Sequence, residues 1–373
     1  MGGHRPPNCP YFAPPMEHTY VAIMAGGVGS RFWPASREDK PKQFLDIMGD
    51  GRSLLRRTFD RFLHITTADK IYIVTNGRYA AEVKAHLPEI SDQQILCEPS
   101  RNNTAPCVAY TAFKLHALDP LANFVIAPSD ALIINETLFA ENIKRALSYT
   151  AAYDALLTLG IAPDRPHTGY GYIQFQAGAK DGVYPVERFT EKPDVATAKS
   201  FLEAGNYLWN AGIFIWRAAT ILQAYERFAP EIYDILKQGQ SCYNTEQEQE
   251  FIDEFYPQTP SISVDYAIME RARNIFTIPA QFGWSDLGAW GALYQESSKD
   301  ENGNVVQADQ ALLTDTHNSY IRAPEDKLVV VGGVDDLLVI DEGDILLIYP
   351  KSREQEIKGL RNQVEEQHGE QFL

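Results

Sequence analysis

The first candidate for chemistry is a glycine-rich turn beside basic side chains. Residues 25–37 are AGGVGSRFWPASR, and they follow the apolar run TYVAIM. Glycine lets a backbone approach a ligand closely, and a glycine-rich turn between a strand and a helix presents N–H groups that favour anions. Arg31 lies inside this stretch, and Arg37, Lys40 and Lys42 follow. We name residues 25–37 the glycine loop, and its composition predicts a phosphate-binding site.

Two common phosphate motifs are absent from the glycine loop. The P-loop pattern GxxxxGK[ST] does not occur, and in the dinucleotide pattern GxGxxG the third glycine would be Phe32. A tight turn without a ligand is the alternative, and the glycines by themselves do not decide between the two. The basic run that continues to PKQF (41–44) favours a ligand, because it is not typical of a generic turn.

Two aspartates follow predicted strands that lie far apart in the chain. Asp130 ends the segment FVIAPSD, and Asp286 follows GWS. Carboxylate oxygens suit Mg²⁺, which takes one or two carboxylates together with phosphate oxygens. The alternative for Asp130 is a turn or a helix cap, and the alternative for Asp286 is the N-cap of a helix that starts at Leu287. The two aspartates are therefore candidates for a metal site.

The elements that would position these residues alternate between apolar runs and amphipathic stretches. The predicted strands are residues 20–25, 70–75, 94–98, 123–128 and 155–161. The helical patterns between them are residues 53–64, 78–87, 104–118 and 135–152. This order predicts an α/β fold with a Rossmann-like, mostly parallel sheet flanked by helices, in which ligands bind at the carboxyl ends of strands. The glycine loop follows such an end.

The rest of the chain has a different pattern. Residues 165–218 favour an antiparallel extension of the same domain, and helices are predicted at 218–238 and 246–256. From residue 300, short β segments recur about every ten residues, which predicts a small β domain of one or two solenoid coils, such as a short left-handed β-helix. A charged helix at 353–367 follows. The predicted units are a disordered leader at 1–18, the α/β domain at 19–299 and the β-rich domain with its closing helix at 300–373.

Composition excludes several classes of protein. The 373 residues suffice for two domains. The net charge of −17 argues against a nucleic-acid partner, and no apolar run approaches the length of a membrane span. The four cysteines form no CxxC pair and have no zinc spacing, so we expect reduced thiols in a cytoplasmic protein. The leader lacks the apolar core of a signal peptide.

The glycine loop is part of a longer motif, AGGVGSRFWPASREDKPKQFL. This motif resembles the signature of the sugar-nucleotide pyrophosphorylase family, and its FWP and PKQF forms are similar to the mannose-1-phosphate guanylyltransferases of that family. Further segments resemble the same proteins in the same order, namely EPSRNNTAPC, APSDALI, TGYGYIQ, ERFTEKPD, WNAGIFIW, SVDYAIME and GWSDLGAW. The resemblance covers nearly the whole chain from residue 19, and it implies a fold of the nucleotide-diphospho-sugar transferase type.

The reaction that the resemblance implies is transfer of GMP from GTP to α-D-mannose 1-phosphate, with release of pyrophosphate. The second pKa of a phosphomonoester is about 6, so the nucleophile is already ionised at neutral pH and needs no strong general base. The enzyme must align two polyanions and stabilise the leaving pyrophosphate, which calls for cations, backbone donors and a divalent metal. Mg²⁺ or another divalent cation is therefore the expected cofactor.

The resemblance also implies a role for each candidate residue. The catalytic candidates are Arg31 and Lys42, which neutralise and reach the phosphates, and Asp130 and Asp286, which bind the metal. The nucleotide-binding candidates are Gly26, Gly27, Gly29, Ser30, Arg31, Lys42, Glu98, Pro99, Asn103, Thr104 and Asp130. The sugar-phosphate-binding candidates are Gly171, Glu191, Lys192 and Asn210. In this last group Lys192 would hold the phosphate and Glu191 the sugar hydroxyls.

One segment departs from the family pattern. Relatives usually have EP-x-x-Arg-Asn-Thr-Ala-Pro, whereas here Asn102 stands where the arginine is expected and Arg101 comes one position earlier. Two arrangements stay open: Arg101 makes the usual contact with the base from its shifted position, or it makes none.

Three alternatives to the implied function stay open. The same chemistry could act on another sugar 1-phosphate such as a heptose, or on another nucleotide. A non-catalytic homologue that binds GDP-mannose and regulates a partner would be expected to lose the phosphate and metal residues, which are all present. We expect a homodimer, formed through the β-rich domain, and no isomerase activity, because the chain has no room for a cupin domain. His167 is predicted to be a surface residue.

Overall fold

The computed structural model describes residues 16–373. Residues 1–15, which make up most of the predicted leader, lie outside the described residues. Met16–His18 form a 3₁₀ turn directly before the first strand. The ring nitrogen Nδ1 of His18 lies 2.8 Å from Oδ2 of Asp119. The described fold therefore begins slightly before the predicted domain boundary.

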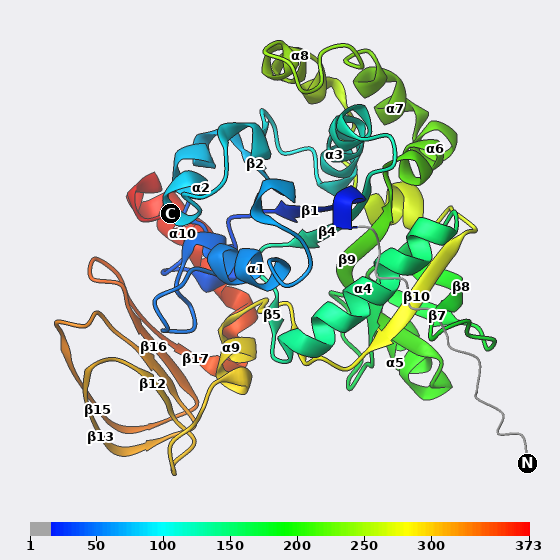
Figure 1. The fold of residues 1–373 in the computed structure, drawn as a ribbon. Helices are drawn as coiled ribbons and strands as arrows, with labels where there is room; N and C mark the ends of the chain where they lie inside the picture. Colours follow the sequence, from blue (N-terminus) through cyan, green and yellow to red (C-terminus); the bar gives the residue numbers. More distant parts are fainter. Residues whose placement is uncertain (1–15) are drawn as a thin grey trace, which may run out of the picture.

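The larger part of the chain is built on one nine-stranded sheet (Figure 1). In spatial order its strands are β3 (Ile95–Glu98), β2 (Ile71–Asn76), β1 (Thr19–Met24), β4 (Asn123–Pro128), β9 (Tyr207–Arg217), β6 (Leu156–Ile161), β10 (Ile275–Ala280), β8 (Tyr184–Thr190) and β7 (Tyr172–Phe175). The first four pair in parallel, and so do β6 and β10. Antiparallel β9 lies between β4 and β6, and β7 and β8 form the antiparallel extension.

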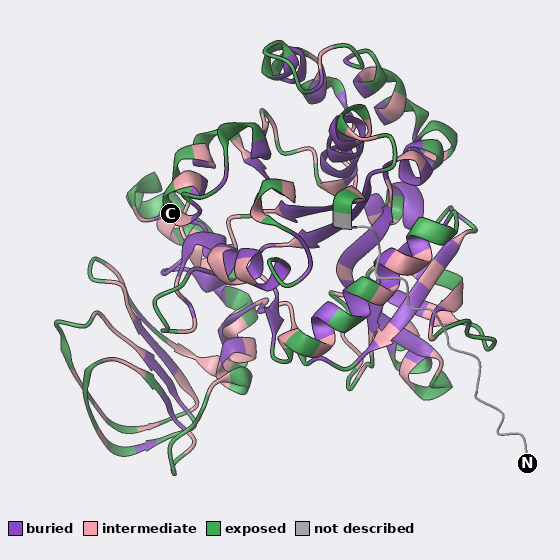
Figure 2. Cartoon of the chain, in the orientation of Figure 1, coloured by how far each residue is buried: buried purple, intermediate pink, exposed green. Residues whose placement is uncertain are grey.

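Successive residues of β1 face two different hydrophobic clusters. Tyr20 and Ala22 belong to the cluster on one face of the sheet, and Val21 and Ile23 belong to the cluster on the other. This explains the nearly continuous apolar sequence of the strand, which is typical of parallel strands that are covered on both faces. Figure 2 shows these central strands as buried.

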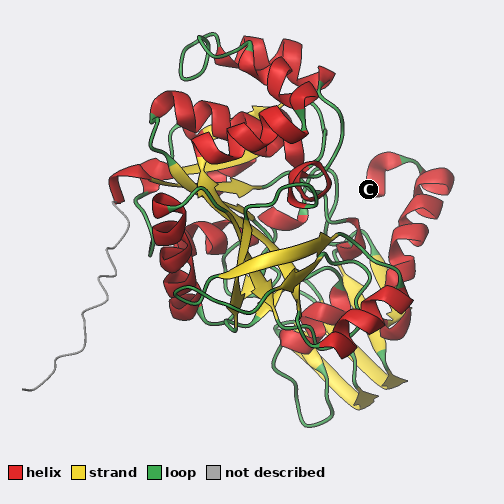
Figure 3. Cartoon of the chain, turned by 90° about the vertical axis from the view of Figure 1, so that its right-hand side faces the viewer, coloured by secondary structure: helices red, strands yellow, loops and turns green. Residues whose placement is uncertain are grey.

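Helices lie on both faces of the sheet (Figure 3). One cluster joins it to α3 (Thr104–Leu118), α6 (Ala218–Phe228), α7 (Pro230–Lys237) and α8 (Glu248–Phe255). The other joins it to α1 (Leu54–Phe62), α2 (Ala80–His86) and α4 (Glu136–Ala152). A further helix, α5 (Val195–Ala204), contacts β9. Within residues 16–373, every helix is too short or too polar to cross a membrane.

One predicted helix is wrong in its extent. Residues 218–238 form two helices, α6 and α7, instead of one. Pro230 stands at the start of α7, where its missing N–H costs nothing, whereas inside one continuous helix it would remove a backbone hydrogen bond. The predictions for 104–118 and 123–128 agree with α3 and β4.

The C-terminal part is a small β-helix. It follows α9 (Trp290–Glu296), and its strands are β12 (Val305–Gln307), β13 (Gln310–His317), β14 (Tyr320–Arg322), β15 (Leu328–Asp335), β16 (Leu337–Asp341) and β17 (Leu346–Pro350). Strands β12, β14 and β16 pair in parallel in one sheet, and β13 and β15 pair in parallel in another. Successive strands thus alternate between two sheets, as solenoid coils do. Antiparallel β17 closes the first sheet, and α10 (Ile357–His368) follows.

The aromatic residues of the glycine loop join the two domains. Phe32 and Trp33 belong to one buried cluster with Trp290 of α9 and Tyr320 of β14. The ring centroids of Phe32 and Trp290 are 4.9 Å apart, and those of Trp290 and Tyr320 are 5.5 Å apart. Contact with the C-terminal domain therefore holds the part of the glycine loop that contains Phe32 and Trp33.

Candidate active site

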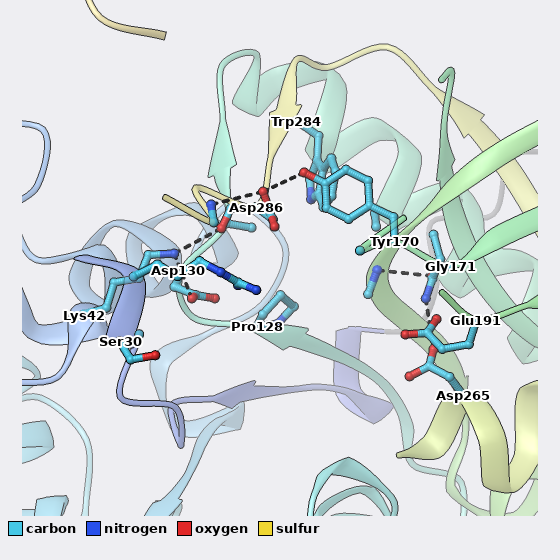
Figure 4. A pocket seen from close by; sticks show the side chains of 18 residues that line it. Ser30, Lys42, Pro128, Asp130, Tyr170, Gly171, Glu191, Asp265, Trp284 and Asp286 are labelled. Carbon is cyan, nitrogen blue, oxygen red and sulfur yellow. Dashed lines mark hydrogen bonds and ion pairs between the residues drawn. The ribbon is translucent and has the colours of Figure 1, made fainter. Parts of the chain in front are cut away.

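The carboxyl ends of β1 and β4 open onto a cleft of about 490 Å³ (Figure 4). The two strands are parallel neighbours, and Met24 pairs with Pro128 at their ends. The loops that follow them, the glycine loop and the turn of Asp130, therefore meet at one edge of the sheet. The predicted site residues that line this cleft are Gly29, Ser30, Arg31, Lys42, Asp130, Gly171, Glu191, Asn210 and Asp286. We name it the active-site cleft.

Two glycines of the loop serve different purposes. Gly29 has a φ of 75°, and a Cβ added there would lie 2.5 Å from Cβ of Lys42. A Cβ added at Gly27 would meet no atom within 4 Å. Gly29 therefore makes room for the protein's own lysine, whereas the exposed backbone at Gly27 leaves space for a ligand.

Lys42 is held inside the cleft wall. Its residue is only 3% exposed, and its backbone N–H donates to the carbonyl of Val28 over 3.2 Å. The Nζ ammonium donates to Oδ2 of Asp130 at 3.0 Å and to the backbone carbonyl of Asp286 at 3.1 Å. Lys42 is therefore not a solvated surface charge, which is the common state of lysine, and its ammonium links the two loops that carry the aspartates.

A short antiparallel ribbon brings the two aspartates together. It consists of β5 (Leu132–Ile133) and β11 (Trp284–Ser285), in which Leu132 pairs with Ser285. Asp130 precedes the first strand and Asp286 follows the second, so both lie at the same end of the ribbon. Neither aspartate caps a helix: β5 follows Asp130, and α9 begins only at Trp290. The helix-cap alternatives are therefore wrong for both residues.

Tyr170 is a cleft residue that the sequence did not single out. Its hydroxyl donates to Oδ1 of Asp286 at 2.7 Å, and the backbone N–H of Gly288 donates to the same oxygen at 3.1 Å. Burial, and then the charge of Asp286, raise the pKa of the Tyr170 hydroxyl well above its usual value. The ring of His167 stacks on Tyr170 with 3.8 Å between the centroids, so His167 is half-buried and keeps only part of its side chain at the surface.

The carboxylates fit a metal that takes most of its ligands from phosphates. Among residues 16–373, no group of three or more His, Cys, Asp or Glu side chains is placed to hold a metal by itself. Asp130 and Asp286 both line the cleft, and two carboxylates are what a magnesium site beside substrate phosphates needs. The side chain of Asp130 is 39% exposed, so one face of its carboxylate is open to the cleft.

The other end of the cleft carries the predicted sugar residues. A Cβ added at Gly171 would collide with Oε2 of Glu191, so this glycine makes room for the carboxylate. The backbone N–H of Asn210 donates to the carbonyl of Gly171 at 2.8 Å. Lys192 has a φ of 47°, and its Nζ lies 3.0 Å from Oε1 of Glu191. Lys192 itself lines a neighbouring cavity instead of the active-site cleft.

The predicted base-binding segment lies outside the cleft wall. Asn103 is the N-cap of α3, and its side chain accepts from the N–H of Thr104 at 2.8 Å. The amide of Asn102 donates to the carbonyls of Tyr256 and Thr259, at 3.1 Å and 2.8 Å. Asn102 therefore fastens this segment to the chain after α8. Arg101 stays exposed.

Glu98 lies beneath the glycine loop. A Cβ added at Gly26 would be 3.8 Å from its Oε2, and the hydroxyl of Tyr256 donates to its Oε1. Burial raises the pKa of Glu98 to about 7. Pro99, next to it, is exposed.

Comparison with known proteins decides the family. The model of the nucleotidyl transferase family matches residues 20–303, which is most of the chain. The chain belongs to the nucleotidyl transferase family. A second model, described as a mannoseP isomerase/GMP-like beta-helix domain, matches residues 303–364.

Individual members of the family show the same relationship. The chain is 35% identical to mannose-1-phosphate guanylyltransferase 2 of Escherichia coli O157:H7, over 95% of this chain and 75% of that protein. It is 37% identical to mannose-1-phosphate guanylyltransferase of Klebsiella pneumoniae, over 90% of this chain and 72% of that protein. A crystal structure described as mannose-1-phosphate geranyltransferase from Thermus thermophilus superposes with a TM-score of 0.83 at 30% identity, covering 93% of this chain and 99% of that chain. The chain is thus a nucleotidyltransferase with the predicted fold.

The nucleotidyltransferase cleft adjoins a second cavity of about 850 Å³. Arg31, Tyr170 and Asp286 line both spaces. The far wall of the second cavity comes from the segment after β17, where Glu354 accepts from the backbone N–H of Gly291. The C-terminal domain therefore lines a cavity next to the end of the cleft that holds Arg31 and Asp286.

Proposed function

We propose that this nucleotidyltransferase transfers GMP from GTP to α-D-mannose 1-phosphate, forming GDP-mannose and pyrophosphate. The observation that carries the proposal is that one cleft has two chemically different ends. One end holds Arg31, Lys42 and the aspartate pair, and the other holds Glu191 and Asn210. The first end suits a triphosphate, and the second suits a polyhydroxyl group. The names of the relatives supply the guanine and mannose of the proposal.

In the proposed reaction a phosphate oxygen of the sugar phosphate attacks the α-phosphorus of GTP. The new P–O bond forms as the bond to the β-phosphate breaks, and pyrophosphate leaves with the electron pair. Lys42 is fixed by its two hydrogen bonds, so its charge is placed before the substrates arrive. Arg31 is exposed at the cleft mouth, where it would neutralise the triphosphate.

Asp130 and Asp286 would hold Mg²⁺ or another divalent cation. When bound, the metal would lower the charge repulsion between the two polyanions. Tyr170 orients the Asp286 carboxylate by donating to Oδ1, which leaves Oδ2 for a ligand. Such a hydrogen bond to a metal ligand fixes its rotamer and commonly supports metal affinity.

The experiment is a pyrophosphate-release assay over a grid of nucleoside triphosphates and sugar 1-phosphates with Mg²⁺. GTP with mannose 1-phosphate is expected to give the highest kcat/KM. A better pair elsewhere in the grid would replace the substrate assignment and leave the chemistry intact. No turnover with any pair, together with tight binding of GDP-mannose, would instead support a regulatory homologue.

The aspartates give a second check on the chemistry. Asp286→Ala is expected to abolish nearly all turnover, because it removes a metal ligand. Asp92→Asn is a matched control, since it removes the same charge from a side chain that is 93% exposed. Full activity in Asp286→Ala would refute the mechanism. The homodimer and the cytoplasmic location stay predictions, and the molar mass from light scattering at micromolar concentration tests the first.

A further inference from the structure

Asp265 is a half-buried residue whose carboxyl group lies at the end of the active-site cleft that holds Glu191. It begins a π-helical turn, Asp265–Met269, whose residues Ala267, Ile268 and Met269 are buried in the core. The N–H of Val264, just before it, donates to the hydroxyl of Thr104 at 2.9 Å. Such turns are rare and occur frequently at functional sites. This anchoring places the carboxyl group of Asp265 in the cleft wall (Figure 4).

The hydrogen bonds of Asn210 limit what that residue can offer a sugar. Its Oδ1 accepts from the hydroxyl of Thr158 at 2.8 Å and from the N–H of Gly212 at 3.2 Å. Its Nδ2 donates to Oδ1 of Asp265 at 3.0 Å. A side-chain amide has two lone pairs and two N–H groups, so only one N–H of Asn210 is left. Most of the remaining capacity at this end belongs to the carboxyl groups.

Asp265 keeps acceptor capacity for a ligand. A carboxylate accepts about four hydrogen bonds, whereas Asn210, Ser263 and the residue's own backbone N–H account for three at most. The carboxyl groups of Asp265 and Glu191 lie side by side at the end of the cleft (Figure 4). Asp265 is therefore placed to contact the same group as Glu191.

We propose that Asp265 carries a proton and, together with Glu191, binds two neighbouring hydroxyls of the sugar. The pair then offers one O–H donor and several acceptors, which matches two hydroxyls better than two ionised carboxylates would. The proposal rests on the proposed function, because it takes the ligand of this end to be a sugar phosphate. It adds a specificity-determining residue to that site.

The electrostatic surroundings agree with this geometry. Burial, and then the charge of Glu191, raise the pKa of Asp265 to about 7. Lys192 acts in the opposite direction, and its Nζ pairs with Glu191. Tyr225 is the buried phenol that feels the Asp265 charge, and Glu270 accepts from the backbone N–H of Glu191.

The test measures binding of GDP-mannose by calorimetry between pH 6 and 8.5, and binding of GDP at one fixed pH as a reference. GDP-mannose has no terminal phosphate, so its charge does not change near pH 7, whereas the terminal phosphate of GDP titrates in this range. In the wild-type protein the affinity for GDP-mannose should fall as the pH rises through about 7, because the proton of Asp265 is lost. Because GDP lacks the sugar, unchanged binding of GDP shows that a variant is still folded and still binds the nucleotide.

Two substitutions separate the proton of Asp265 from a structural effect. Asp265→Asn supplies a permanent neutral donor, so its affinity for GDP-mannose should not change with pH. Asp265→Ala should bind GDP-mannose about 10- to 100-fold more weakly and bind GDP as the wild type does. Asp92→Asn serves as the charge control and should match the wild type.

Two results would overturn the proposal. One is an unchanged ratio of the two dissociation constants in Asp265→Ala, and the other is a pH dependence that persists in Asp265→Asn. If the substrate grid selects another pair, the same comparison uses the corresponding nucleotide sugar and its nucleoside diphosphate. An error in the substrate and an error about Asp265 are thus measured separately.

Discussion

Replacing Gly29 by alanine tests whether this glycine makes room for Lys42. The residue has a φ of 75°, and the added Cβ would lie 2.5 Å from Cβ of Lys42. The left-handed conformation costs about 1–2 kcal/mol for alanine, and overpacking adds about 1–3 kcal/mol. We therefore expect Gly29→Ala to lower the free energy of unfolding by about 2–5 kcal/mol. The clash is with the Cβ of the buried Lys42 side chain, which cannot move away as the tip of a flexible side chain could.

The same substitution should impair turnover. Lys42 has to shift to relieve the contact, and this moves its Nζ away from the positions 3.0 Å from Asp130 and 3.1 Å from the Asp286 carbonyl. A displacement of about 1 Å in a positioned group costs on the order of 100-fold in rate. The assays are thermal unfolding without nucleotide, where a drop of roughly 3–6 °C is expected, and kcat/KM from pyrophosphate release.

Gly27→Ala is the matched control in the same loop. No atom lies within 4 Å of the Cβ that it would add, so the free energy of unfolding should stay within about 0.5 kcal/mol of the wild type. If Gly27 instead makes space for phosphate, its substitution should raise KM for GTP without lowering stability. Equal stability and equal kcat/KM for Gly29→Ala and the wild type would refute the role that we assign to Gly29.

Three further predictions concern single side chains. Glu98→Gln should flatten the pH dependence of the free energy of unfolding. Burial raises the pKa of Glu98 from 4.5 to about 7, so the protonated carboxyl stabilises the fold fully below pH 4.5. This stabilisation, on the order of 3 kcal/mol, is lost as the pH rises through 7. Denaturant titrations at pH 5 and pH 8 measure it, and an unchanged slope would contradict it. Glu248→Ala should lower the free energy of unfolding by about 3–5 kcal/mol, because it leaves the buried Lys114 ammonium, which lies 2.6 Å from the Glu248 carboxylate, without its partner. Thermal unfolding measures the loss, and the double variant Lys114→Met, Glu248→Leu should recover most of it. Tyr170→Phe should raise the Mg²⁺ concentration needed for half-maximal activity by about 10-fold, since it removes the 2.7 Å hydrogen bond to Asp286; an unchanged metal dependence would count against Asp286 as a ligand.

The parts of the fold that local sequence decides could be predicted. Strand β4 and helix α3 begin and end where the apolar patterns do, because each pattern has a clear stop, such as Asp119 after α3. The edge where the glycine loop meets Asp130 follows from the strand order alone, since carboxyl ends of parallel strands lie together. The insertion of antiparallel β9 between β4 and β6 could not be predicted, because the residues of a strand do not show which other strands it pairs with.

The parts of the site that depend on contacts over long distances in sequence could not be predicted. Tyr170 meets Asp286 across 116 positions of sequence, and the segment around Tyr170 indicated only a family resemblance and a role for Gly171. Asn102 stands where an arginine is expected, and its amide donates to the carbonyl of Thr259. The sequence around neither residue indicates this hydrogen bond. Asp265 lies in a motif that was quoted for its resemblance but given no role, and only its position beside Asn210 shows its chemistry.

The glycine loop is held from both sides, and this explains its unusual composition. On the cleft side, Gly29 admits Lys42, which fixes the aspartate loops. On the other side, the indole N–H of Trp33 donates to the carbonyl of Phe372 at 2.8 Å, and Arg37 binds both carboxylate oxygens of Asp344. The glycines leave the cleft side of the loop with few side chains of its own, so the contacts that hold this loop come mainly from the opposite side. Phe32 and Trp33 supply part of these contacts by packing against the β-helix domain, and the glycine loop is therefore positioned by both domains at once.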